Sequence, residues 1–351
     1  MRPWPILAAI VGMAAMAALV GYFGAGAVTH SLRSIGAGGF AAICAVHLAL
    51  IGVMGLAWRT LLPGIHPGKV IWARLVRDSG SEALPLSQVG GFVLGARALA
   101  LAGVPGTLAA ASTIVDVTLE FVAQLAYTAL GLIWLVRLQP DTRVAAPVLL
   151  GLAFAAFAAA GFVLVQRRGL DYFDRIARIL GRGWADRSAA GAAALHAALA
   201  GIYRRRGRLL ASCAVHLTCW ITSAIEVWLA LRIAGQPLSF GAVLAIESLV
   251  YAIRTVAFAV PQAVGIQEGA YIVLGAGFGL TPDMALAVSL VKRGRDLAIG
   301  LPVIAIWQAI EGNRLWRRRA AAMMRASQIP AEIPAEIAAE IAAEIAAPPP
   351  K

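Results

Sequence analysis

The chain has 351 residues, of which 60% are hydrophobic and only 14% are charged, and its mean hydropathy is +0.79. This composition excludes an ordinary water-soluble protein and predicts a polytopic membrane protein. The formal net charge of +12 does not indicate nucleic-acid binding, because the basic residues gather beside apolar segments, as they do in proteins that face a membrane surface.

About nine apolar segments follow one another along the chain, and most are near the roughly 20 residues that a helix needs to cross a bilayer. Because the lipid core offers no partners for backbone hydrogen bonds, these segments are predicted to be helices, and the fold class is all-α. The first segment also has features of a secretory signal, but its length favours a retained span. The segments are residues 4–28, 39–58, 89–110, 113–136, 144–165, 209–233, 238–260, 265–280 and 284–310.

Basic residues gather in three connections between or after the apolar segments, at residues 69–77, 166–208 and 314–325. The positive-inside tendency predicts that these connections and both termini are cytoplasmic. An even number of crossings is then required, and about eight are expected. The glycine-rich segments 89–110 and 265–280 are the candidates for re-entrant hairpins that do not span the membrane.

Two of the basic connections contain short amphipathic patterns. Residues 70–77 and 170–182 combine apolar and basic side chains at helical spacing. This pattern, which includes Arg74 and Arg77, predicts helices that lie on anionic lipid headgroups. Helices that connect and cap the bundle are an equally good interpretation, and the two do not conflict.

Two stretches of the chain, residues 85–136 and 261–310, share an order of features. Each begins at a proline, continues through a glycine-rich segment to a second proline, and ends in an alanine-rich helix with charges near its middle. This order predicts two related halves with broken helices, as in many transporters. Chance similarity between Gly/Ala-rich segments is the alternative. Residues 1–312 are predicted to form the membrane domain, and residues 313–351 a basic, low-complexity cytoplasmic tail.

Several charged residues lie inside the apolar segments, where the lipid core makes them costly, and such residues usually mark a path for a polar group. Arginine suits phosphate or carboxylate because its guanidinium donates two parallel hydrogen bonds, whereas a carboxylate suits an amine or a proton. Glu226 and Glu247 add further charges. The alternative is that all these residues form internal ion pairs that hold helices together. The residues predicted to line a pathway for a lipid headgroup are Arg97, Asp116, Glu120, Arg254, Glu268, Lys292, Arg293 and Arg295.

No metal or cofactor is expected. Cys213, His216 and Cys219 follow one another at spacings of three, but three ligands in an apolar span indicate helix packing more than a metal site. The sequence contains no phosphate-binding loop, dinucleotide fingerprint, nucleophile elbow or zinc-protease motif, so a conventional enzyme is not expected. An enzyme that uses only intramembrane carboxylates stays open.

The most specific motifs lie in the second half of the chain. They are Pro261-Gln-Ala-Val-Gly-Ile-Gln-Glu-Gly-Ala-Tyr, Leu274-Gly-Ala-Gly-Phe-Gly-Leu-Thr-Pro and Ala285-Leu-Ala-Val-Ser-Leu-Val-Lys-Arg-Gly-Arg-Asp-Leu. Together with the earlier Leu84-Pro-Leu-Ser-Gln-Val-Gly-Gly, they resemble the transmembrane region of the lysylphosphatidylglycerol synthase/flippase family. Within that family they look most like the hopanoid-biosynthesis-associated membrane protein L group.

The resemblance implies a multi-pass protein of a bacterial inner membrane that moves or presents a lipid, with a hopanoid or an anionic phospholipid as cargo. It adds Gln267 and Asp296 to the pathway residues. The chain differs from the synthase members in that it carries no soluble aminoacyl-transferase domain. Lysyl transfer is therefore not expected. A function like that of the flippase part of the family is expected.

Three functions follow from these observations. The leading hypothesis is a lipid translocase in which the tails stay in hydrocarbon while the headgroup crosses a charged groove. The alternative is a membrane scaffold that docks hopanoid-biosynthesis enzymes on its basic loop and its C-terminal basic cluster. An intramembrane enzyme that acts on a lipid headgroup is the third. The expected partners are membrane lipids and no nucleic acid, and the oligomeric state is left open.

Overall fold

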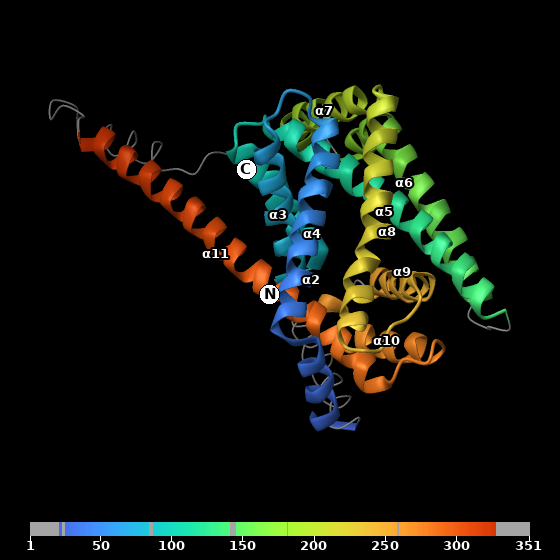
Figure 1. The fold of residues 1–351 in the computed structure, drawn as a ribbon. Coiled ribbons are helices and arrows are strands. Elements are labelled where there is room, and N and C mark those ends of the chain that lie inside the picture. Colours follow the sequence, from blue (N-terminus) through green and yellow to red (C-terminus); the bar gives the residue numbers. More distant parts are fainter. Residues whose placement is uncertain are drawn as a thin grey trace, which may run out of the picture. The chain divides into compact units, whose positions relative to one another are not determined.

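The structure is a computed structural model that describes residues 21–22, 25–83, 87–140, 145–180, 182–257 and 260–327. Within these ranges it contains ten α-helices, one short 3₁₀-helix and no strand, which confirms the predicted all-α fold class (Figure 1). The chain divides into two compact units, residues 1–301 and 302–351, with the boundary inside the last helix. Most of the first apolar segment, 4–28, and the Ala-Glu-Ile tail lie outside the described residues.

The first group of helices comprises α2 (Ala25–Leu61), α3 (Pro67–Ala83), α4 (Ser87–Leu101) and α5 (Gly106–Leu138). The short helices α3 and α4 pack against each other, and α2 packs against α3 (Figure 1). Gly103 has a φ of 95° in the turn after α4, a left-handed conformation that favours glycine. Pro105 then directly precedes α5. The predicted break within the segment 89–110 falls at this turn.

Three helices follow, namely α6 (Ala145–Leu180), α7 (Arg182–Tyr203) and α8 (Arg206–Ile233). The long helix α5 contacts all three of them, and α8 also packs along α2. The basic connection 166–208 is therefore largely helical. The helix predicted over 170–182 falls on the end of α6 and the start of α7.

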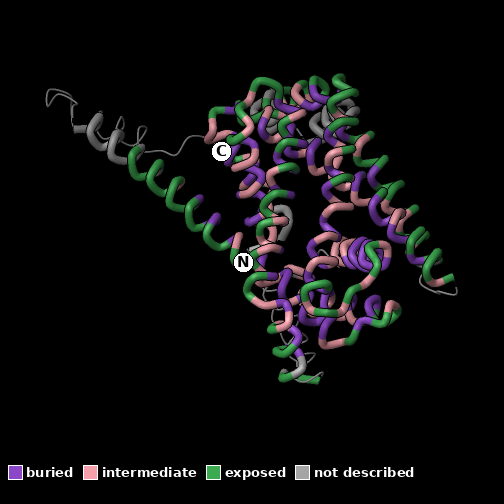
Figure 2. The backbone as a smooth tube through the Cα atoms, viewed as in Figure 1, coloured by how far each residue is buried: buried purple, intermediate pink, exposed green. Residues whose placement is uncertain are grey.

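The second group comprises α9 (Phe240–Val256), the 3₁₀-helix η1 (Pro261–Ala263), α10 (Ile266–Ala276) and α11 (Pro282–Ser327). Ser239 caps α9, because its Oγ accepts a hydrogen bond from the N–H of Ala242 at 3.2 Å. Every residue from Ala242 to Val250 is buried, so α9 lies in the interior of the first unit (Figure 2). Gly265 has a φ of 82° where α10 begins, and its N–H donates to Glu268 at 2.7 Å.

The two groups share an order of elements. In each, two short helices, α3 and α4 or α9 and α10, precede a longer helix, α5 or α11. The turn before the longer helix contains a glycine with positive φ in both groups, Gly103 at 95° and Gly279 at 78°. This order includes the two stretches 85–136 and 261–310 and adds a short helix before each. The internal repeat itself stays a prediction.

Four of the described helices are long and apolar enough to cross a membrane, at Val28–Leu61, Gly106–Leu138, Val148–Gln166 and Arg206–Ile233. In the third of these, Phe154 and Phe157 are 73% and 79% exposed. Large apolar side chains directed outward in this way are suited to contact with lipid. The chain is therefore a multi-pass membrane protein. The number of about eight crossings stays a prediction, as does the re-entrant character of the glycine-rich segments.

Candidate functional site

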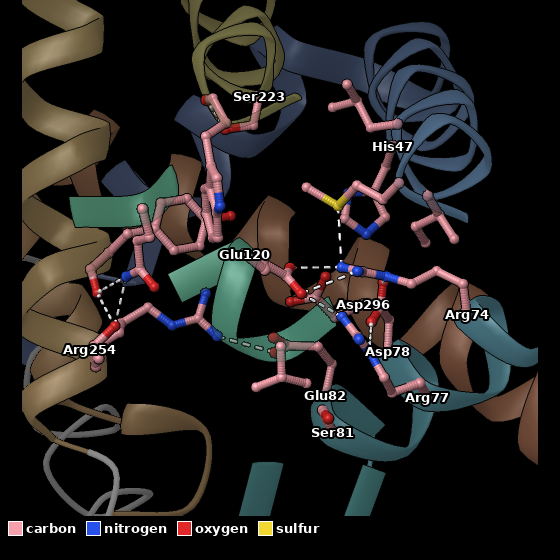
Figure 3. A pocket seen from close by; sticks show the side chains of 18 of the residues that line it. His47, Arg74, Arg77, Asp78, Ser81, Glu82, Glu120, Ser223, Arg254 and Asp296 are labelled. Carbon is pink, nitrogen blue, oxygen red and sulfur yellow. Dashed lines mark hydrogen bonds and ion pairs between the residues drawn. The ribbon is translucent and has the colours of Figure 1, made fainter. Parts of the chain in front are cut away.

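The first unit contains a cavity of about 200 Å³, lined by side chains from α2, α3, α4, α5, α8, α9 and α11 (Figure 3). Apolar side chains such as Leu50, Phe121 and Trp220 form part of the wall. Ionisable side chains form much of the rest, and such side chains are costly within a membrane. The charged and histidine residues of the wall are His47, Arg74, Arg77, Asp78, Glu82, Glu120, Glu226, Arg254, Arg295 and Asp296.

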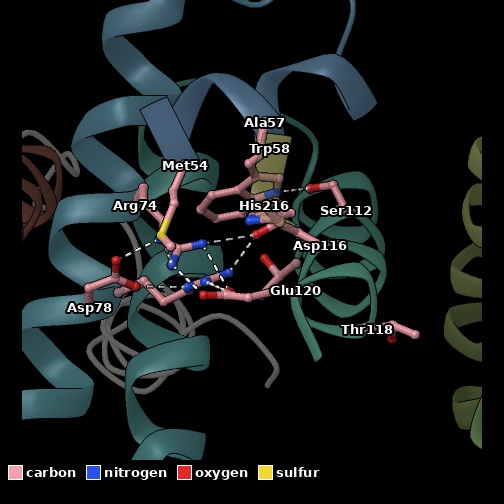
Figure 4. A network of polar contacts seen from close by, with 12 residues as sticks. Met54, Ala57, Trp58, Arg74, Asp78, Ser112, Asp116, Thr118, Glu120 and His216 are labelled. Atoms are coloured by element: carbon pink, nitrogen blue, oxygen red, sulfur yellow. Dashed lines mark hydrogen bonds and ion pairs between the residues drawn. The ribbon is translucent and has the colours of Figure 1, made fainter. Parts of the chain in front are cut away.

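One part of this wall belongs to a network that we call the first ion cluster, consisting of Arg74, Arg77, Asp78, Asp116, Glu120 and His216 (Figure 4). Asp116 and Glu120 are four residues apart, so they share one face of α5. Arg74 donates hydrogen bonds to both carboxylate oxygens of Glu120, at 2.6 and 3.0 Å. Arg77 donates to Asp116 Oδ2 at 2.7 Å and also to Glu120. Two guanidinium groups of α3 thus bridge two carboxylates of α5.

Two aromatic rings lie beside Arg77 in the first ion cluster. Arg74 and Arg77 are only 3% and 2% exposed. The guanidinium carbon of Arg77 lies 5.5 Å from the ring centroid of Trp58 and 5.7 Å from that of Phe92. Trp58 is held in place in turn, because its Nε1 donates to Ser112 Oγ at 3.3 Å. Burial of this kind makes the ion pairs costly to break.

Residues 70–77 had two interpretations, and the one that places them on lipid headgroups is wrong for their arginines. Arg74 and Arg77 are buried and bind carboxylates of another helix. A combination of apolar and basic residues is expected both for a helix on a membrane surface and for one that packs against an acidic helix. Only the acidic partners Asp116 and Glu120 distinguish a helix on a membrane surface from a packed one. They lie 39 and 46 residues from their arginine partners in the sequence.

His216 connects α8 to the first ion cluster. Its Nε2 lies 3.0 Å from Asp116 Oδ1, and its side chain is fully buried. Its Nδ1 has no hydrogen-bond partner among the described residues. Within the same part of the chain, no group of three or more metal-binding side chains lies together. The described contact of His216 is thus a hydrogen bond that links α8 to a carboxylate of α5.

A second ion cluster consists of His47, Glu226, Arg295 and Asp296, from α2, α8 and α11. His47 Nδ1 lies 3.0 Å from Glu226 Oε1. Arg295 donates to the other oxygen of Glu226, and its Nη2 donates to Asp296 Oδ1 at 2.6 Å. Glu226 and Arg295 are each 2% exposed, whereas His47 is 22% exposed and lines the cavity (Figure 3).

A further ion pair joins α3 to α9 at the cavity wall. Arg254 Nη2 donates to Glu82 Oε2 at 3.0 Å (Figure 3). Gln262, just after α9, donates to the backbone oxygen of Ser81 at 2.6 Å. The ends of two short helices, one from each group, are therefore tied together beside the cavity.

The sequence from residue 6 to residue 303 matches the family described as the lysylphosphatidylglycerol synthase TM region, and this match contains every residue of the cavity wall. The chain belongs to this family. Neither curated proteins nor solved structures gave a match. Membership of the lysylphosphatidylglycerol synthase TM region family confirms the resemblance seen in the sequence and indicates a membrane lipid-related function. The narrower hopanoid L group is a proposal.

The structure brings some of the predicted pathway residues together. Four of them line the cavity, namely Glu120, Arg254, Arg295 and Asp296. Asp116 lies behind the wall, one helical turn from Glu120 in the first ion cluster. Arg97 is exposed on α4 and is not part of the described cavity wall.

The other predicted residues, Gln267, Glu268, Lys292 and Arg293, form two further networks and are not themselves part of the cavity wall. Lys292 donates to Glu247, which also accepts a hydrogen bond from Tyr271. The ammonium of Lys292 lies 4.8 Å from the ring centroid of Tyr251, a cation–π distance. This network joins α9, α10 and α11.

The second of these networks lies between α10 and α11. Arg293 donates to both carboxylate oxygens of Glu268. Gln267 donates to Ser289 Oγ at 2.7 Å, and this hydroxyl donates to Glu268 at 3.0 Å. For these residues the contacts agree with the alternative drawn from the sequence, that of ion pairs which hold helices together.

The predicted pathway residues lack six of the ten charged or histidine residues of the cavity wall, namely His47, Arg74, Arg77, Asp78, Glu82 and Glu226. A signal for three of them is present in the sequence. Arg74, Asp78 and Glu82 follow one another at every fourth residue, so they lie on one face of a helix. Mixed signs on one face are not needed for contact with anionic lipid, but they are expected where a helix faces charges of both signs.

Proposed function

We propose that this protein is a lipid translocase of a bacterial inner membrane, with both termini in the cytoplasm. In this proposal the lipid headgroup passes through the cavity while the acyl or hopanoid part stays in hydrocarbon. The observation that carries the proposal is the cavity itself, where ten charged or histidine side chains from five apolar helices and α3 meet around about 200 Å³. Such a lining offers polar partners to a headgroup inside the membrane.

The charges of the cavity wall favour one class of lipid headgroup over another. The described wall carries four arginines and five carboxylates, and its arginines are already engaged in ion pairs. An anionic phospholipid would have to displace a carboxylate from its arginine, at a cost in electrostatic energy. A headgroup with an amine meets the excess carboxylate directly. We therefore propose a hopanoid or a phospholipid with an amine-bearing headgroup as cargo, ahead of a purely anionic one.

The test is headgroup movement in liposomes that contain the purified protein. Phosphatidylglycerol, phosphatidylethanolamine and an amine-bearing hopanoid, each labelled on its apolar part, are followed with a membrane-impermeant quencher. We expect the wild type to accelerate movement of the amine-bearing lipids most. Arg295→Ala should abolish this movement, whereas Arg137→Ala, at an exposed arginine of α5, should not. Folded wild type that moves none of the three lipids would overturn the proposal.

A scaffold for hopanoid-biosynthesis enzymes is the second candidate, and one observation favours it. Arg204, Arg205, Arg206 and Arg208 are all exposed where α7 meets α8. A dense basic surface of this kind suits an acidic protein partner. Replacement of Arg204, Arg205 and Arg206 by glutamate should then abolish co-purification of such enzymes. If movement of lipid is unaffected by that change, docking and translocation are separate properties.

A further inference from the structure

The segment between α9 and α10 has a backbone conformation that its side chains disfavour. Gln262 has a φ of 58° and Ala263 a φ of 46°, and among the described residues these are the only non-glycine residues with a positive φ. In the left-handed region a Cβ atom lies too close to the following carbonyl oxygen, so both residues are strained. Glycine adopts such a conformation without strain, as Gly265 does at a φ of 82° in the same segment.

Arg293 of α11 holds the strained segment in place. Its guanidinium donates to the backbone oxygens of Gln262, at 3.2 Å, and of Ala263, at 3.3 Å, and it also donates to Glu268. Glu268 is fully buried and accepts a hydrogen bond from the N–H of Gly265 at 2.7 Å. A strained backbone persists only where its surroundings impose it. Here one ion pair binds three backbone groups of the segment.

The same segment reaches across the cavity wall to α3. Gln262 Nε2 donates to the backbone oxygen of Ser81 at 2.6 Å, and Arg254 Nη2 of α9 donates to Glu82 at 3.0 Å (Figure 3). Ser81, Glu82 and Arg254 all line the cavity. In the part of the chain that the structure describes, α3 packs extensively against α2 and α4, but not against α9 or α10. The two edges of the wall are thus joined here by polar contacts and not by packed helices.

Other helices around the cavity are held together more firmly. Broad packing joins α2 to α8 and joins α5 to both α8 and α9. The buried pair of Arg77 and Asp116 joins α3 to α5. Glu82, in contrast, is 31% exposed. A wall opens most readily where separation exposes little apolar surface and breaks partly solvated polar contacts. The contact between the α9–α10 segment and the end of α3 is such a place.

We propose that residues 260–265 form a latch that closes the cavity, and that relaxation of the strained backbone at Gln262 and Ala263 releases it. In the open state both residues leave the left-handed region, Gln262 separates from Ser81, and the cavity becomes accessible between α3 and α9. Strain that is present only in the closed state lowers the cost of opening. The latch rests on the translocase function in one respect, because its opening is what admits the lipid headgroup.

The latch gives a role to charged residues that do not line the cavity. Glu268 belongs to the motif that begins at Pro261, and Arg293 belongs to the motif that begins at Ala285. Both were predicted to line the pathway of a headgroup, but their described contacts are with the protein. In this proposal they are positioning residues that act on the backbone of the latch.

The strain is tested with two variants that lose the same side chain. Gln262→Ala and Gln262→Gly both remove the contact with Ser81, but only glycine adopts a positive φ without strain. In a cysteine-free background with Ser223→Cys at the cavity wall, labelling by a water-soluble maleimide reports opening. We expect Gln262→Ala to be labelled faster than the parent. Gln262→Gly should be labelled about fivefold to tenfold more slowly than Gln262→Ala, which corresponds to roughly 1–1.4 kcal/mol of strain.

Ala276→Gly is the control for the effect of a glycine in itself, because Ala276 is exposed at the end of α10. This variant should be labelled as fast as the parent. Equal or faster labelling of Gln262→Gly than of Gln262→Ala, at matched unfolding temperatures in detergent, would overturn the release of strain. Arg293→Lys is a second test that keeps the charge beside Glu268. A lysine cannot reproduce the fork that binds both backbone oxygens, so we expect severalfold faster labelling, and an unchanged rate would contradict the latch.

Closure is tested in liposomes with Glu82→Cys and Arg254→Cys in one chain. A reducible bifunctional thiol reagent joins the two cysteines, and movement of labelled phosphatidylethanolamine is followed before and after reduction. We expect the cross-link to stop the movement and reduction to restore it. Cross-linked protein that moves lipid at the uncross-linked rate would overturn the latch and leave translocation standing. Wild type that moves no lipid, while the labelling rates follow the expected order, would overturn translocation and leave the latch standing.

Discussion

Arg254 of α9 and Glu82 of α3 form an ion pair of 3.0 Å beside the cavity, and they are 12% and 31% exposed. Partly solvated pairs contribute little to stability, about 0–1 kcal/mol. Arg77 and Asp116, in contrast, are 2% and 0% exposed and are locked in a network of four further side chains. The pair between α3 and α9 is therefore the more easily opened of the two, and it borders the space through which we propose that the headgroup passes.

Loss of the Arg254–Glu82 pair should make the cavity more accessible. In a cysteine-free background with Ser223→Cys, a cavity residue, we expect Glu82→Gln to raise the rate of labelling by a water-soluble maleimide up to about fivefold, the equivalent of roughly 1 kcal/mol. Arg254→Gln should act similarly, and the double variant should equal either single one. Additive effects of the two changes would contradict a direct pair.

The close approach of α3 and α4 depends on Gly91. A Cβ atom at this position would lie 2.7 Å from the backbone nitrogen of Ser81 and would also collide with the backbone oxygen of Arg77. Backbone atoms cannot move aside as a flexible side chain can, so we expect Gly91→Ala to destabilise the protein by on the order of 1–3 kcal/mol. Gly90 is the matched control, because a Cβ there meets nothing within 4 Å.

The measurement for this pair of variants is thermal unfolding in detergent. Gly91→Ala should unfold at a lower temperature than the wild type, and Gly90→Ala at the same or a higher temperature, because alanine favours the helix more than glycine does. Equal effects of the two substitutions would mean that the contact between α3 and α4 at Gly91 adds nothing to stability.

More of the fold than of the candidate site could be predicted from the sequence. Apolar segments of about 20 residues satisfy their backbone hydrogen bonds in lipid by forming helices, so the all-α class followed from composition and length alone. The break before Gly106 was also predictable, because Gly103 and Pro105 terminate helices. These features depend on residues close together in the sequence. Membership of the family likewise followed from contiguous motifs such as the one that begins at Pro261.

The pairing of charges could not be predicted in the same way. Arg77 and Asp116 are 39 residues apart, and His47 and Glu226 are 179 apart. No pattern among neighbouring residues of the sequence indicates contacts over such separations. One of the two interpretations of residues 70–77 therefore placed Arg74 and Arg77 on a lipid surface, although burial between helices makes them part of the cavity wall. Whether a charge in an apolar helix faces a ligand or another side chain is decided by tertiary packing.

The first ion cluster should be essential for folding as well as for function. Arg77→Ala removes the 2.7 Å contact of Asp116 Oδ2 and leaves Arg74 at 3.5 Å as its nearest guanidinium. A buried charge that loses its partner typically costs about 3–5 kcal/mol, so we expect a large fall in unfolding temperature. Arg77→Ala combined with Asp116→Asn should recover part of it, because the unpaired charge is then gone. A double variant less stable than Arg77→Ala would contradict this explanation.

The charge of the cavity should set the choice of cargo. Asp296 lines the wall and binds Arg295, so Asp296→Asn removes the excess carboxylate and frees part of a guanidinium. We expect movement of an amine-bearing lipid to slow about tenfold, which corresponds to roughly 1.4 kcal/mol, and movement of phosphatidylglycerol to slow less or to increase. Asp283→Asn is the control, because Asp283 binds Ser31 away from the cavity wall. Equal slowing of both lipids would show that Asp296 supports the structure of the wall and does not select the headgroup.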